Sequence, residues 1–170
     1  MLSISTDFHS DGTGDPLPYL RRIADAGFSH IHWCHEYWTD YLYTQSDINQ
    51  VRRWLDEFGL RILDLHGSGM DTADWTASDE RKRRAGGELL KNRLAFVAQL
   101  ADPGGSVVMH LGMANVGVTR LNEPGATQAR RSLDELEDFC RERGVFIALE
   151  NSKNFAVLRH FLAAFGPEFV

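Results

Sequence analysis

The chain has 170 residues, of which 43% are hydrophobic and 25% are charged, and its formal net charge is -6. This size and composition are typical of one soluble globular domain, and they argue against disorder and against a protein built mainly to grip phosphate backbones. No window approaches the roughly 20 apolar residues of a membrane span, and the distant Cys34 and Cys140 indicate neither a disulfide framework nor a cysteine zinc site. We therefore expect a cytoplasmic protein.

The first part of the chain alternates short strand patterns with longer helical ones. The runs LSIST and HIHW predict strands at 2–6 and 30–33. Apolar residues at helical spacing predict helices over 16–28 and 46–59, the second with Ser46 as its N-cap. Each of these strands is thus followed by a helix.

The same alternation continues along the rest of the chain. Further strands are predicted at 60–65, 106–110 and 145–149, and further helices at 78–100, 124–143 and 154–165. Gly59 and Gly144 stand where two of the helices should end. The last residues, 168–170, resemble the start of a sixth strand.

Five consecutive βα units imply a parallel sheet covered by helices, as in an open doubly wound sheet or a section of a (β/α)₈ barrel. The glycine-rich GxGxxG turn is missing after the first strand, where TDFHSDGTGD stands, so we expect no dinucleotide binding. The five units average about 34 residues, so the eight units of a full barrel would need roughly 270 residues, close to the typical size. We predict an α/β chain of the TIM-barrel type, incomplete at about five βα units. It would form a single domain over 1–170, truncated near the start of the sixth strand.

Chemistry in a barrel lies at the carboxyl ends of the strands, where this chain places an unusual set of side chains. The candidates at these ends are His32, Trp33, His66, His110, Glu150 and Asn151. A single histidine at a strand end is usually a hydrogen-bonded residue at the rim of a core, but histidines at several ends indicate a site. We expect His66, His110 and Glu150 to converge, because two imidazoles and a carboxylate suit a divalent metal ion. The histidines would either bind that metal or line a pocket.

Four short segments carry a resemblance to a known family. LHGSG, VVMHLG and ALEN occur in this order, and GFSHIHW precedes them. Together they resemble the xylose-isomerase-like (AP endonuclease family 2) TIM barrel superfamily, which includes sugar and sugar-phosphate isomerases and epimerases and endonuclease IV. The resemblance implies that Glu150 is a metal ligand, and that His66 and His110 help to hold a metal or line the substrate pocket. The family's other ligands belong to later strands, beyond Val170.

The resemblance also implies an activity in carbohydrate metabolism. The chain would belong to a metal-dependent isomerase or epimerase that acts on a small sugar or sugar phosphate through an enediolate intermediate, with Mn²⁺, Zn²⁺, Co²⁺ or Mg²⁺ as cofactor. Glu150 would be the catalytic residue that moves the proton. The expected substrate-binding residues are His66, His110, Trp33, His32 and Asn151. The expected partner is a small molecule rather than nucleic acid or a membrane, and a homo-oligomer is a further expectation.

Two other functions are compatible with the same residues. The first is a DNA-repair nuclease of the endonuclease IV kind, although the acidic charge and HGSG in place of that group's HAPY argue against it. The basic run RKRR at 81–84 follows Asp79 and Glu80, and it indicates a solvated helix face more than a phosphate contact. The second alternative is a catalytically inactive partial barrel.

Overall fold

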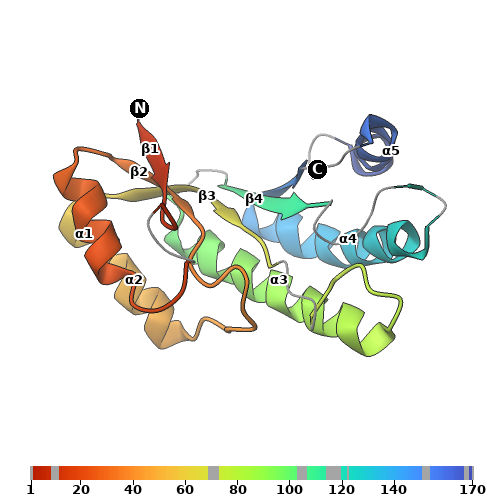
Figure 1. Ribbon diagram of the computed structural model, residues 1–170, viewed down its shortest axis with the longest axis horizontal. Helices are drawn as coiled ribbons and strands as arrows, with labels where there is room; N and C mark the ends of the chain where they lie inside the picture. The colour runs from red at the N-terminus through yellow and green to blue at the C-terminus, as the bar shows by residue number, and fades with distance from the viewer. Residues whose placement is uncertain are drawn as a thin grey trace.

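The computed structural model shows strands and helices alternating along the chain in five βα units (Figure 1). The residues that the structure describes are 2–8, 12–68, 73–102, 107–113, 120–121, 123–150, 154–166 and 169. The strands are β1 (Ser3–Ser5), β2 (His30–Trp33), β3 (Arg61–His66), β4 (Val107–Gly112) and β5 (Val145–Glu150). The helices are α1 (Leu17–Asp25), α2 (Gln45–Phe58), α3 (Glu80–Leu100), α4 (Pro124–Arg143) and α5 (Phe155–Phe165). Every strand and helix predicted up to residue 165 is present, with small differences at the ends.

The strand order decides between the two predicted architectures. The five strands form one parallel sheet in the order β1-β2-β3-β4-β5, so each strand pairs with the next one in the sequence. A doubly wound sheet reverses its order at a switch point, whereas a (β/α)₈ barrel adds its strands in sequence. The described part of the chain therefore has the barrel order, and Figure 1 shows α1 to α4 along one side of the twisted sheet.

Local sequence signals set the helix ends. The N-cap of α2 is Thr44 rather than the predicted Ser46, because the Thr44 side chain accepts a hydrogen bond from the backbone N–H of Asp47 and the Asp47 carboxylate accepts one from the backbone N–H of Thr44. The helices α2 and α4 end at Gly59 and Gly144 as predicted, and both glycines are left-handed, with φ of 65° and 64°. No helix among the described residues is both long enough and apolar enough to cross a membrane.

The hydrophobic core lies between the sheet and the helices. Along β4, the side chains of Val107, Met109 and Leu111 are buried, whereas the residues between them are only partly buried. This alternation follows from the two-residue period of a strand, which sends successive side chains to opposite faces of the sheet. The helix-covered face is therefore apolar and closed. The opposite face, which we call the inner face, remains accessible.

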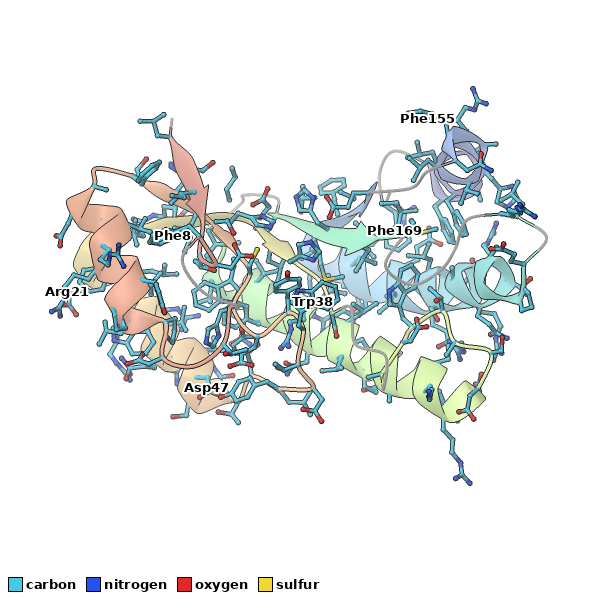
Figure 2. All side chains as sticks on the ribbon, viewed as in Figure 1. Phe8, Arg21, Trp38, Asp47, Phe155 and Phe169 are labelled. Carbon is cyan, nitrogen blue, oxygen red and sulfur yellow. The ribbon has the colours of Figure 1, made fainter. Side chains whose placement is uncertain are left out.

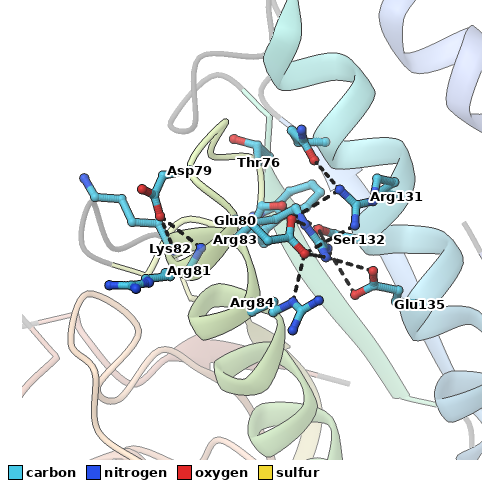
Figure 3. A network of polar contacts seen from close by, with 12 residues as sticks. Thr76, Asp79, Glu80, Arg81, Lys82, Arg83, Arg84, Arg131, Ser132 and Glu135 are labelled. Atoms are coloured by element: carbon cyan, nitrogen blue, oxygen red, sulfur yellow. Dashed lines mark hydrogen bonds and ion pairs between the residues drawn. The ribbon is translucent and has the colours of Figure 1, made fainter.

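The basic run at 81–84 does not form a fully solvated helix face, because one of its arginines is buried. The side chain of Arg83 is 1% exposed, and its guanidinium donates hydrogen bonds to the carboxylates of Glu80 and Glu135 and to the Ser132 hydroxyl (Figure 3). The neighbouring Arg84 also binds Glu80, and hydrogen bonds from both arginines lower the pKa of that carboxyl to about 2. Burying a guanidinium demands such compensation. This network joins the start of α3 to α4, and it engages two of the basic side chains that a phosphate would need.

The end of the chain returns to the sheet. Phe169 is the one described residue of the predicted sixth strand, and its carbonyl accepts a hydrogen bond of 2.8 Å from the backbone N–H of Ile147 in β5. Its ring is buried against Phe165 of α5, whereas Phe155 at the start of that helix is 75% exposed (Figure 2). Residues 168 and 170 lie outside the described residues, so the sixth strand stays a prediction.

Candidate metal centre and active site

Polar side chains of four neighbouring strands share the inner face of the sheet, at its carboxyl edge. The strand register pairs His32 with Asp64, and His66 with His110. It also pairs Gly112, two residues after His110, with Glu150 of β5. Because side chains two apart on a strand share a face, the register gathers all five groups on the side away from the helices.

An irregularity between β2 and β3 helps to assemble this set. Ile31 pairs with Ile62, but the next residue, His32, pairs with Asp64, so β3 has one extra residue at this point. Such bulges redirect side chains and are frequent next to functional sites. Here the bulge places the Asp64 carboxylate level with the His32 ring.

The five side chains form a continuous series of contacts across the inner face. Nδ1 of His32 lies 2.6 Å from Oδ1 of Asp64, and Nε2 of His110 lies 3.1 Å from the other oxygen of the same carboxylate. On its far side, Nδ1 of His110 lies 3.3 Å from Oε2 of Glu150. Nε2 of His66 lies 3.2 Å from Oε1 of Glu150. Each carboxylate thus lies between two imidazoles, and we call these five residues the inner-face cluster.

The contacts shift the pKa values of three members. Burial would raise the pKa of Asp64, but hydrogen bonds from His110 and His32 outweigh it and hold the pKa well below its usual range. The pKa of His110 is raised, chiefly by its hydrogen bond to Asp64. The pKa of His66 is lowered, chiefly by burial. At neutral pH Asp64 is therefore ionised.

The inner-face cluster is accessible to small molecules. The five side chains are between 18% and 30% exposed, so none is sealed in the core and none stands free in solvent. The ring of Tyr37, in the loop after β2, lies 4.7 Å from the ring of His66. A small polar ligand or a cation can therefore reach these groups.

The structure brings together four of the predicted site residues, which are His32, His66, His110 and Glu150. Their roles as ligands, acid/base or substrate contacts stay predictions. Asn151 lies outside the described residues. Among the described residues, one group of three offers ligand atoms that all lie within 4.8 Å of one another, and it consists of His32, Asp64 and His110. The predicted ligands His66 and Glu150 lie beside this group.

Trp33 is not brought to the inner-face cluster, contrary to the expectation that it contacts substrate there. As the neighbour of His32 on the strand, its side chain takes the opposite face of the sheet. It is 1% exposed, packs 5.2 Å from the ring of Phe96 in α3, and donates a hydrogen bond to the Tyr43 hydroxyl. It lines a cavity of about 160 Å³ beside α2, on that other face. Trp33 is thus a core residue of the closed face.

Asp64 is the member of the inner-face cluster that the sequence analysis missed. It lies inside the apolar run LRILDL, two positions before His66, and therefore on the same face of the strand as that histidine. An acidic residue between the apolar residues Leu63 and Leu65 was the available signal. Its pairing with His32 also depends on the bulge, which no single strand pattern reveals.

Known proteins share this fold. An uncharacterized protein of Sinorhizobium fredii, y4fM, is 29% identical over 89% of this chain and 56% of its own length. A D-allulose 3-epimerase from a Methylomonas species, solved in complex with D-allulose, superposes with a TM-score of 0.70 at 18% identity, over 98% of this chain and 59% of that one. A xylose isomerase-like TIM barrel protein from Mycobacterium smegmatis, solved in complex with magnesium, has a TM-score of 0.62 at 16% identity, over 88% and 52% of the two chains.

The chain spans between 52% and 59% of the lengths of these proteins. At such low identity the structural likenesses show a shared fold, in agreement with the sequential strand order. The family described as xylose isomerase-like TIM barrel matches residues 20–164, which is most of the chain. The chain therefore belongs to the xylose isomerase-like TIM barrel family.

Proposed function

We propose that the protein carrying this chain is a metal-dependent isomerase or epimerase of a small sugar or sugar phosphate. The observation that carries the proposal is the inner-face cluster, in which Glu150 lies within 3.3 Å of both His66 and His110 at the carboxyl edge of the sheet. Active sites of TIM barrels lie at this edge. Because the chain spans little more than half of its relatives, the proposal concerns the whole protein.

The donor atoms of the inner-face cluster fit a divalent cation. Imidazole nitrogens and carboxylate oxygens are the ligands that Zn²⁺, Mn²⁺ and Co²⁺ accept, and three such groups lie within 4.8 Å of one another. Asp64 is only partly buried and is held ionised by hydrogen bonds from His110 and His32, so it offers an anionic ligand on the accessible face. One similar structure is a complex with magnesium. When bound, a divalent cation would supply a Lewis acid that stabilises negative charge on the substrate's oxygens.

Glu150 has the position that a proton-transfer group needs. As a carboxylate it would take the proton from the substrate carbon next to the carbonyl, and the electron pair of the broken C–H bond would move toward the carbonyl oxygen. Delivery of a proton to the opposite face of that carbon by a second acid, which the whole protein would have to supply, gives the epimer. Return of the Glu150 proton to the former carbonyl carbon, with the hydroxyl proton passing to the other oxygen, gives the isomer. His66 and His110 flank this carboxylate, so their rings would orient it. A similar fold acts on a ketose in the D-allulose 3-epimerase.

A substrate panel tests the proposal. The protein encoded by the intact gene would be incubated with free ketoses, aldoses and their phosphate esters, and the products would be followed by NMR. We expect one sugar class to form an epimer or isomer, the activity to disappear after metal removal with a chelator, and a divalent cation to restore it. Turnover that is unchanged in the chelated protein, or no turnover of any sugar with every metal supplied, would contradict the proposal.

A further inference from the structure

We propose that His32, Asp64 and His110 bind one divalent cation of the Zn²⁺ or Co²⁺ type, and that Glu150 supports this site from outside as the hydrogen-bond partner of His110. The site lies within the inner-face cluster on which the proposed function also depends. Only the chemical role of the cation rests on the proposed function, and the choice of ligands does not. It differs from the ligand set His66, His110 and Glu150 that the sequence predicts.

The positions of the three ligands favour this assignment. They come from three neighbouring strands, β2, β3 and β4, and their side chains share the inner face. Their ligand atoms all lie within 4.8 Å of one another. A tetrahedral zinc site with bonds of about 2.1 Å separates its ligand atoms by roughly 3.4 Å. In this structure His32 and His110 lie 2.6 Å and 3.1 Å from the two oxygens of Asp64, so the three groups are near the spacing that such a site requires.

The two nitrogens of His110 have different partners, and this difference assigns the role of Glu150. Nε2 faces Asp64 at 3.1 Å, and Nδ1 faces Glu150 at 3.3 Å. A histidine that binds a metal through one nitrogen commonly donates the N–H of its other nitrogen to a carboxylate, which fixes the ring and raises its basicity. With Nε2 on the cation, the Nδ1–H of His110 would donate to Glu150. The same geometry therefore makes Glu150 an outer carboxylate rather than a ligand.

The composition of the site fits a catalytic rather than a closed structural metal. Two imidazoles and one carboxylate are a common ligand set of catalytic zinc, and three protein ligands leave a coordination position for water or substrate. The three side chains are between 21% and 25% exposed on the inner face, so that position can be reached. His66 lies next to the group, with its ring centre 5.9 Å from that of His32, but it contacts the carboxylate of Glu150.

Zinc titration of ligand variants tests the assignment. Isothermal titration calorimetry with Zn²⁺ would be run near neutral pH on the metal-free wild type and on His32→Gln, Asp64→Asn, Glu150→Gln and His66→Gln. His30→Gln is the matched control, because His30 lies on the same strand as His32 but contacts Ser29 instead of a carboxylate. Circular dichroism would verify that each variant is folded.

We expect the wild type and the His30→Gln and His66→Gln variants to bind one equivalent of zinc with similar affinity. Glu150→Gln should bind about 10- to 100-fold more weakly, the usual effect of losing an outer partner. His32→Gln and Asp64→Asn should lose more than that, because each removes a ligand. The assignment is overturned if the wild type binds no zinc. It is also overturned if His66→Gln and Glu150→Gln abolish binding while Asp64→Asn binds like the wild type.

These outcomes are separate from those of the proposed function. If the zinc affinities follow the expected order but the protein turns over no sugar, the metal site is supported and the proposed function is contradicted. If the protein turns over sugar but its His32→Gln and Asp64→Asn variants bind zinc like the wild type, the metal site is overturned and the proposed function is unaffected.

Discussion

Replacement of Glu150 by glutamine is expected to lower kcat by about 10²- to 10⁴-fold, the usual contribution of a general acid/base. Glutamine keeps the shape of the side chain and its place between His66 and His110, but it cannot accept the substrate's proton. Steady-state kinetics would be measured on the sugar identified by the substrate panel, at a metal concentration that saturates the variant. Saturation separates the loss of proton transfer from the weaker metal binding expected for this variant.

His30→Gln is the control for this experiment as well, because it removes a histidine of the same sheet whose ring contacts Ser29. It should keep kcat within a few-fold of the wild type. If Glu150→Gln turns over at the wild-type rate, then Glu150 does not carry the proton, and the isomerase proposal loses the residue on which its chemistry depends.

Gly86→Ala is expected to destabilise the protein, although alanine is the better helix former. A Cβ atom at Gly86 would lie 2.3 Å from the backbone nitrogen of Trp75 and 2.7 Å from the carbonyl oxygen of Ala73. Backbone atoms cannot yield as a flexible side chain does, and overpacking of this kind typically costs about 1–3 kcal/mol. That cost exceeds the gain of about 1 kcal/mol in helix propensity. The free energy of unfolding, measured by urea denaturation, should therefore fall.

The adjacent Gly87 provides the matched comparison. A Cβ atom at this position meets no atom within 4 Å, and its φ is not in the left-handed region. Gly87→Ala should therefore raise the free energy of unfolding by up to about 1 kcal/mol, because only helix propensity changes. Equal effects of the two substitutions would show that the close approach of α3 to the segment before it does not determine stability.

The elements of this fold are predictable because each one carries its own signal. Short apolar runs indicate the strands, residues at helical spacing indicate the helices, and Gly59 and Gly144 mark two helix ends. The close approach at Gly86 is different in kind. In the sequence, Gly86 only lowers the helix propensity of its segment. A glycine is needed there because the backbone of Trp75 lies against the helix, and no periodicity of the sequence reveals that contact.

The candidate site is predictable only in part, for a related reason. His66, His110 and Glu150 stand at strand ends, so the barrel order alone is enough to bring them together. Asp64 lies inside a strand, and its place beside His32 follows from a bulge that shifts the register of two strands. The opposite orientation of Trp33 and His32 was predictable from the sequence, because neighbouring residues of a strand face opposite sides of the sheet.

The central claim is that a divalent cation binds on the inner face among His32, Asp64 and His110. Anomalous diffraction at the zinc absorption edge, from crystals of the protein grown with Zn²⁺, tests it most directly. We predict an anomalous peak with one atom of each of these three residues at about 2.0–2.2 Å, and with Glu150 in contact with His110 but not with the ion. A peak bound by Glu150 and His66 without His32 or Asp64, or an inner face with no peak, would contradict the account.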